Sequence, residues 1–289
     1  MNYIIFDLEW NQPSTPEATI TDPMYISGEI IQIGAVKLND AFEIIDELRL
    51  FIRPTYYPKL HKRISALTHI RDRDLAEAPL FPDAFETFTS WCGEEYAYMT
   101  WSMSDMPMLV ENMLLHNIDC TRLPVCYDIQ RIFGREINRS TVRCSLDHAL
   151  EILNLKGDVA HDALHDARNT AKVCSCLDLE QYLDEYAASA YALPPCSSVY
   201  QSIHDALRDD TLKAFPCPFC GAEIIGESWQ TLAPNTYMSY GYCPDEDDEF
   251  ILQLSLTPCR PGEFRAKRMF YGMSDDLWEI YNDKLAQDS

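Results

Sequence analysis

A short apolar run near the start of the chain, residues 3–6 (YIIF), is followed at once by the acids Asp7 and Glu9. Such a run predicts a buried strand, with the two acids at its carboxyl end. Residues two apart on a strand point to the same face, so both carboxylates face one spot while Leu8 returns to the core. The alternative is an ordinary strand that ends in a solvated turn. The choice depends on whether other stretches bring further acids to this place.

Length and charge limit the class of protein. The chain has 289 residues and a formal net charge of −23, from 46 acids against 23 Lys and Arg. This length suffices for a full core and a small second unit. The negative charge argues against a protein that coats nucleic acid, although a metal-dependent site still accepts phosphates locally.

The start of the chain and its cysteines indicate a compartment. No basic or apolar leader follows Met1, and no apolar run is long enough to span a bilayer, so we expect a cytoplasmic protein without membrane contact. Eleven cysteines in such a chain are expected to stay reduced, as core residues or metal ligands.

The order of the predicted elements indicates an α/β fold. Strands at 29–38 and 43–53 follow the first strand closely and predict an antiparallel meander. Further strands are expected at 96–101 and 125–128. Helices are expected to begin at Pro82, after Asp105 and after Ser145, and a last long helix is expected to run to about Tyr186.

Two later stretches supply the additional acids. Asp105 lies where a predicted strand meets a helix, a position at which Asp is also a common helix cap. In the stretch 157–170 (GDVAHDALHDARNT), a cap at Asp162 would make His161 project from the incoming loop and turn Asp166 inward. His165 lies one turn from His161, so spacing alone does not say which histidine takes part in chemistry.

Together these residues resemble a known family. The sequence FDLE at 6–9, the mid-chain Asp105, and His161 followed by Asp166 are similar to the three exonuclease motifs of the DEDD superfamily, the DnaQ-like and RNase T-like enzymes. A histidine five residues before the last aspartate is typical of the DEDDh branch and favours His161 over His165. The resemblance covers about residues 1–186. It implies an RNase H-like mixed sheet flanked by helices, within a domain that we place at 1–187.

The resemblance also implies a mechanism. Asp7, Glu9, Asp105 and Asp166 would hold two Mg²⁺ or Mn²⁺ ions, and His161 would take the proton from the attacking water. The expected activity is 3′-to-5′ hydrolysis of single-stranded RNA or DNA from its 3′ end, with RNA somewhat preferred.

A second stretch resembles the Eri-like and KapD-like exonucleases. Residues 65–71 (SALTHIR) correspond to a loop that borders the terminal nucleotide in those enzymes, which implies that Leu67, Thr68 and His69 bind substrate. His69 replaces the Gly that is usual there, and Trp10 follows Glu9 where Thr or Gly is frequent, so Trp10 is a further candidate contact. Basic residues gather around this stretch, where a phosphate backbone is expected to lie: Arg53, Lys59, Lys62, Arg63, Arg71 and Arg73.

After an expected linker at 188–213, residues 214–289 predict a small β-rich, zinc-ribbon-like domain with a final helix. Cys217 and Cys220 form a Cys-x-x-Cys pair followed by Gly221, and Cys243 resembles the start of a second half. The residue three positions beyond Cys243 is Glu246, which leaves the fourth ligand open. We assign Cys259 to it and keep Asp245, Glu246 and His204 as alternatives. A structural zinc is expected, in preference to a metal-free β unit or a redox pair.

Two rival functions differ in class from the exonuclease. One is a regulatory or binding protein that uses the nuclease fold as a scaffold and the C-terminal domain as a contact surface for a protein partner. The other is a phosphodiesterase for very short oligonucleotides, which fits the acidic charge because small substrates need little backbone contact. The complete set of acids favours the exonuclease.

Overall fold

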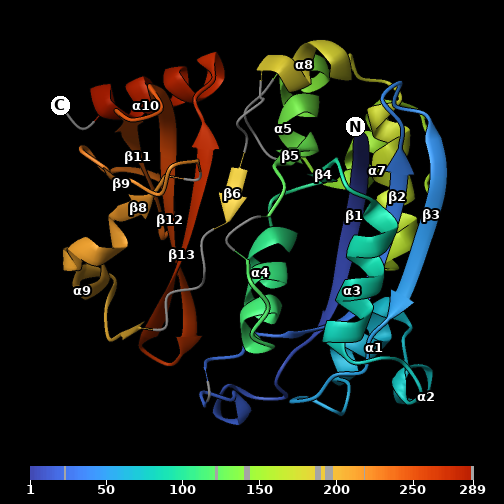
Figure 1. Cartoon of the computed structure of the whole chain (residues 1–289). Coiled ribbons are helices and arrows are strands. Elements are labelled where there is room, and N and C mark those ends of the chain that lie inside the picture. Colours follow the sequence, from blue (N-terminus) through green and yellow to red (C-terminus); the bar gives the residue numbers. More distant parts are fainter. Residues whose placement is uncertain are drawn as a thin grey trace. The chain divides into compact units, whose positions relative to one another are not determined.

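The structure is a computed structural model that describes residues 1–22, 24–120, 123–139, 144–185, 190–192, 198–217 and 219–287. The chain divides into two compact units, Met1–Tyr182 and Leu183–Ser289. Figure 1 shows the elements of each unit in sequence colours. Among the helices of the described residues, none has both the length and the apolar character of a membrane span.

The first unit is built on a mixed sheet. β1 (Asn2–Asn11), β2 (Glu29–Leu38) and β3 (Ile44–Phe51) form the predicted antiparallel meander. β4 (Tyr96–Thr100) pairs with β1 in parallel, and β5 (Cys126–Asp128) pairs with β4 in parallel. The resulting order, β5-β4-β1-β2-β3, places the strand that carries Asp7 and Glu9 at the centre of the sheet.

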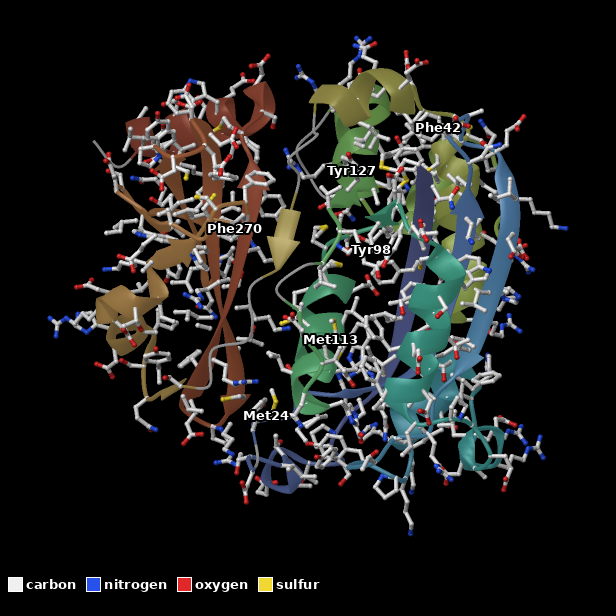
Figure 2. The ribbon with its side chains drawn as sticks, in the orientation of Figure 1. Met24, Phe42, Tyr98, Met113, Tyr127 and Phe270 are labelled. Carbon is white, nitrogen blue, oxygen red and sulfur yellow. The ribbon has the colours of Figure 1, made fainter. Side chains whose placement is uncertain are left out.

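Helices pack on this sheet and close its core. The fully buried rings of Phe6, Phe88 and Tyr98 join β1, α3 (Phe81–Cys92) and β4, and Tyr98 is labelled in Figure 2. The helix α7 (Ala163–Cys174) contacts β1, β2 and β3. The helical elements of this unit are η1 (Pro16–Ala18), α1 (Lys62–Thr68), α2 (Asp72–Leu75), α3 (Phe81–Cys92), α4 (Asp105–Leu115), α5 (Ile129–Phe133), η2 (Gly134–Asn138), α6 (Leu146–Ile152) and α7 (Ala163–Cys174).

The predicted long last helix is wrong in its length. α7 ends at Cys174, and a separate helix, α8 (Leu179–Glu185), follows. Asp178 starts the new helix, because its carboxylate accepts the N–H of Gln181 at 3.3 Å while its own N–H donates to Glu136. The expected end near Tyr186 lies outside the described residues.

The second unit is β-rich, as predicted. Its main sheet consists of the antiparallel strands β10 (Gln230–Ala233), β11 (Thr236–Cys243), β12 (Asp248–Arg260) and β13 (Glu263–Gly272). The short strands β6 (Ala190–Ala192) and β7 (Val199–Tyr200) both pair with β13. A separate hairpin consists of β8 (Ala214–Pro216) and β9 (Glu223–Ile225), and the helical elements are α9 (Ile203–Arg208), η3 (Asp210–Leu212) and α10 (Asp275–Gln287).

The domain limits 1–187, 188–213 and 214–289 stay a prediction, but part of the expected linker has regular structure. Residues 199–212 form β7, α9 and η3. Tyr200, Ala206 and Leu212 pack with Leu254 and Ala266 of the main sheet, which explains why this stretch is ordered.

Candidate active site

The two acids of β1 face the helix α7. In the antiparallel pairing with β2, Asp7 lies opposite Gly34 and Glu9 opposite Gln32, so these four residues share one face of the sheet. β1 is longer than the predicted strand and extends through both acids to Asn11. The acids therefore lie within a rigid central strand rather than in a turn after it.

Asp105 joins the site from the amino end of α4. The pairing of β4 with β1 extends only to Ile5, and beyond it the carboxylate of Asp105 accepts the N–H of Leu8 at 3.1 Å. Asp105 is the first residue of α4 and is buried, while Ser104 holds the capping position. The role of the Asp105 side chain is thus to contact β1 rather than to cap its own helix.

His161 and Asp166 join from the start of α7. Asp162 caps the helix as predicted, with its carboxylate accepting the N–H of His165 at 3.2 Å. The N–H of His161 donates to Asp166 at 2.9 Å across this first turn. Ligand atoms of Glu9, His161 and Asp166 lie within 4.8 Å of one another, and the His165 ring instead lies 3.2 Å from the carbonyl of Val159.

α7 reaches the sheet because β2 offers a glycine there. A Cβ on Gly34 would lie 1.9 Å from the backbone nitrogen of Leu164. Beside it, the Gln32 side chain donates to Asp162 at 3.2 Å and accepts the N–H of Ala163 at 3.0 Å. These contacts hold the first turn of α7 over the acids.

Arg49 of β3 completes this attachment with an ion pair to Asp162 at 2.6 Å. The sequence pattern does not mark Gly34, Gln32 or Arg49. Gly34 and Gln32 lie on β2 opposite the acids and Arg49 on the next strand, β3. Asp162, the partner of Gln32 and Arg49, is more than a hundred residues away from both.

Four carboxylates in this space repel one another. Burial raises the pKa of Asp7 well above its ordinary value, and Asp105, Asp166 and Glu9 raise it further. Burial, together with Asp166 and Asp105, raises the pKa of Glu9 to about 8. Burial also raises the pKa of Asp105 to about 7 and the pKa of Asp166 above its ordinary value. Full ionisation near neutral pH thus requires cations, and these hard oxygen donors suit Mg²⁺ or Mn²⁺.

Comparison with known proteins identifies the family. Residues 4–174, more than half of the chain, match the exonuclease family (RNase_T). The chain belongs to this exonuclease family. The probable 3′-5′ exonuclease KapD of Bacillus subtilis (strain 168) is 24% identical over 184 residues, which are 63% of this chain and 87% of KapD.

Solved structures agree on the fold of the exonuclease. The nuclease domain of 3′hExo, a DEDDh family member bound to rAMP, matches with a TM-score of 0.52 and 21% identity, over 63% of this chain and 92% of that one. E. coli Exonuclease I in complex with a dA16 oligonucleotide matches with a TM-score of 0.50 and 12% identity, over 83% of this chain and 54% of that one. The predicted RNase H-like fold and the predicted class of enzyme, a 3′-to-5′ exonuclease, are confirmed, and membership of the family implies divalent metal ions.

The loop at residues 55–61, which leads into the expected substrate stretch 65–71, is tied to the end of β1 by Asn11, a residue that the sequence pattern does not mark. The buried Asn11 side chain donates to the carbonyls of Tyr57 and Lys59 at 2.8 and 2.9 Å and accepts the N–H of His61 at 2.8 Å. Glu29 accepts three successive N–H groups from the same loop, those of residues 55–57. These bonds position α1, which contacts β1.

The candidate substrate residues differ in exposure. Leu67 is 41% exposed, whereas Thr68 is buried and its hydroxyl donates to the carbonyl of Ile64. His69 ends α1 in the left-handed conformation, with φ of 61°. That conformation favours Gly, which is why replacement of the usual Gly by His strains this turn. Trp10 is partly buried.

In the second unit, the structure brings together three of the four expected cysteines. Ligand atoms of Cys217, Cys220 and Cys243 lie within 4.8 Å of one another. The structure does not bring Cys259, the expected fourth ligand, to this cluster. β12 begins opposite Cys243 and carries Cys259 eleven positions along the strand, which at about 3.3 Å per residue is roughly 35 Å away.

Proposed function

We propose that this exonuclease hydrolyses the phosphodiester bonds of single-stranded nucleic acid from the 3′ end, with two divalent metal ions and with His161 as general base. The observation that carries the proposal is the convergence of Asp7, Glu9, Asp105 and Asp166 beside His161. Four buried acids so close together destabilise a protein that holds no cations, and such a group is typical of a cation-binding site.

The four carboxylates would hold the Mg²⁺ or Mn²⁺ ions. Bound ions would polarise the phosphate and lower the pKa of the attacking water. The chain contributes the alignment, because β1, the Leu8 to Asp105 hydrogen bond and the first turn of α7 fix the carboxylates relative to one another.

His161 would accept the proton of the water on an imidazole nitrogen. Its ring lies beside Glu9 and Asp166, and its backbone is held by the bond from its N–H to Asp166. The exposed position of the residue lets the ring pass the proton on to solvent.

Substrate binding would use the loop tied to β1. Exposed Leu67 would contact the terminal base, while Thr68, His69 and Trp10 would shape the pocket around it. The basic residues at 53–73 would bind the phosphates that follow. A modest preference for RNA over DNA is in keeping with the rAMP ligand of the 3′hExo structure, and the dA16 ligand of Exonuclease I keeps DNA as the competing substrate.

The cofactor proposal includes a structural zinc ion at Cys217, Cys220 and Cys243 of the second unit. Three thiolates at this spacing are typical zinc ligands. The same unit would offer the surface for a protein partner.

The test compares the wild type with Asp7→Asn on single-stranded RNA and DNA of one sequence and several lengths, labelled at the 5′ end. With Mg²⁺ or Mn²⁺, the wild type is expected to give a ladder that shortens from the 3′ end, and neither the variant nor a chelated sample should cut. The ratio of the RNA and DNA rates measures the preference for the sugar. Folded wild type that cuts neither substrate at any length would overturn the proposal and favour the scaffold function.

A further inference from the structure

The two turns that carry the cysteine cluster have the same backbone design. In the first, the N–H of Cys217 donates to the carbonyl of Ala222, five residues on, and Gly221 has a φ of 78°. In the second, Cys243 pairs with Asp248, again five residues on, and Asp247 has a φ of 57°. Each turn thus closes a hairpin of the same length, with the left-handed residue at the same place.

This correspondence places Glu246 where the first turn has Cys220. Both residues stand three positions after the first cysteine of their turn and immediately before the left-handed residue. The N–H groups of Asp245 and Glu246 donate to the sulfur of Cys243, so the second turn wraps around that sulfur. Glu246 is exposed, which leaves its side chain room to turn toward the three sulfurs.

Two of the other candidates for a fourth ligand, His204 and Cys259, lie at the opposite end of the sheet from the cysteines. His204 belongs to α9, which contacts β13 and its partner β7. β7 pairs with β13 at Phe264, whereas the cysteine end of the sheet is the one at which Phe250 pairs with Gly272. Cys259 lies near the same far end as His204.

We propose that Glu246 supplies the fourth ligand of a Zn²⁺ ion held by Cys217, Cys220 and Cys243. A tetrahedral ion with Zn–S distances of about 2.3 Å separates sulfurs by about 3.8 Å, and the sulfurs of Cys220 and Cys243 are 3.5 Å apart. This inference rests on the zinc proposal above and is independent of the nuclease activity.

The ion would link two separate sheets. Cys217 follows β8 of the small hairpin, and Cys243 ends β11 of the main sheet. Between them lies a small core that contains Phe215, Ile224 and Phe250. Zinc would therefore fasten the β8–β9 hairpin over this core, in the way that metals stabilise small β units.

The experiment measures zinc in the full-length protein, purified with a reductant. Wild type is expected to hold one zinc per chain, and X-ray absorption is expected to show three sulfur ligands and one oxygen ligand. Asp7→Asn should keep this zinc, which separates it from metal bound at the nuclease centre. Cys243→Ser should lose it, whereas Cys259→Ser should keep it.

The fourth ligand is tested by the rate at which a chelator removes zinc. Glu246→Ala is expected to release zinc about 10-fold faster than wild type, Glu246→Cys more slowly, and the neighbouring exposed Asp245→Ala at the wild-type rate. Equal rates for Glu246→Ala and Asp245→Ala would overturn the assignment of Glu246 while leaving zinc in place. Wild type that holds no zinc, or that forms a disulfide in the cluster, would overturn zinc itself, and nuclease assays would be unaffected by either result.

Discussion

The nuclease centre takes its ligands from a strand and two helices, whereas the cysteine cluster takes its ligands from two hairpin turns. The carboxylates come from β1, α4 and α7, and they meet only because these elements dock on one another. The cysteines come from two hairpin turns of the same design, within residues 217–243. The first site therefore depends on packing across the whole of its unit, and the second on the conformation of two turns and the small core between them.

The two sites also differ in the metal ions that their ligands suit. Oxygen donors that crowd in a buried space suit hard cations that exchange during catalysis, whereas clustered thiolates suit a zinc ion that stays bound. A change at one site should consequently leave the other intact. The following experiments test that independence and the structural basis of each site.

The largest effect is expected from Asp7→Asn. The change removes the central carboxylate, and activity should fall roughly 10³-fold, about 4 kcal/mol of transition-state stabilisation. The zinc content of the second unit should not change. Single-turnover cleavage and zinc analysis on the same preparation measure both, and a loss of zinc together with activity would break the comparison.

His161→Ala should lower the rate by about 10²- to 10³-fold, because the attacking water loses its proton acceptor. Binding of Mn²⁺ should persist, since the four carboxylates remain. His165→Ala is the matched control, because the His165 ring lies against the carbonyl of Val159, and its activity should stay near that of wild type. Full activity in His161→Ala would remove this histidine from the mechanism.

Gly34→Ala tests whether docking of α7 builds the centre. The new Cβ would meet the backbone of Leu164, so the helix must move and carry Asp166 with it. A displacement of about 1 Å is expected to cost 10-fold or more in activity without loss of any ligand. The control is Gly157→Ala, where the nearest atom is the flexible end of Leu150. An unchanged rate in Gly34→Ala would show that the centre tolerates movement of its helix.

The difference between local and long-range contacts explains which site residues the sequence predicted well. Strand pattern and spacing placed Asp7, Glu9 and the Asp162 cap, because each depends on neighbours within a few residues. The resemblance then indicated that Asp105 and Asp166 come together with them. Nothing local marks Gln32 or Arg49, whose partner Asp162 is 130 and 113 residues away.

The choice of a fourth cysteine ligand has a related origin. Cys259 was assigned by its residue type, although the strand expected at 250–256 already separated it from Cys243, and β12 carries it to the far end of the sheet. Glu246 was left open because its position becomes meaningful only when the two turns are seen to share a conformation.

A smaller effect concerns pH. Burial and neighbouring acids raise the pKa of Glu9 from 4.5 to about 8, so the metal-free fold binds this proton more tightly than the unfolded chain does. The free energy of unfolding in chelator should therefore fall as pH rises from about 4.5 to about 8. Glu9→Gln removes this loss and should be more stable than wild type at pH 8, by on the order of 1 to 2 kcal/mol given its partial exposure.

Urea unfolding in chelator at pH 5 and pH 8 measures this difference, which should shrink at the lower pH. Glu43→Gln, at an exposed site, should show no such dependence on pH. A stabilisation of Glu9→Gln that is equal at both values would show that charge repulsion is not its cause.

The smallest expected effect concerns His69, which ends α1 in the nuclease unit. His69 adopts the left-handed conformation that Gly221 adopts in the second unit. His69→Gly should therefore raise the free energy of unfolding by about 0.5 to 1 kcal/mol, because glycine carries no Cβ penalty there.

Ala66→Gly in the same helix is the matched control, since its backbone is helical and its side chain exposed, and it should destabilise by a similar amount. Chemical unfolding of both variants measures whether each change raises or lowers the free energy of unfolding. If His69→Gly destabilises as Ala66→Gly does, then contacts of the imidazole outweigh the turn strain. The turn at His69 would then be stabilised by side-chain packing, as the nuclease centre is, and not by its local backbone conformation, as the cysteine turns are.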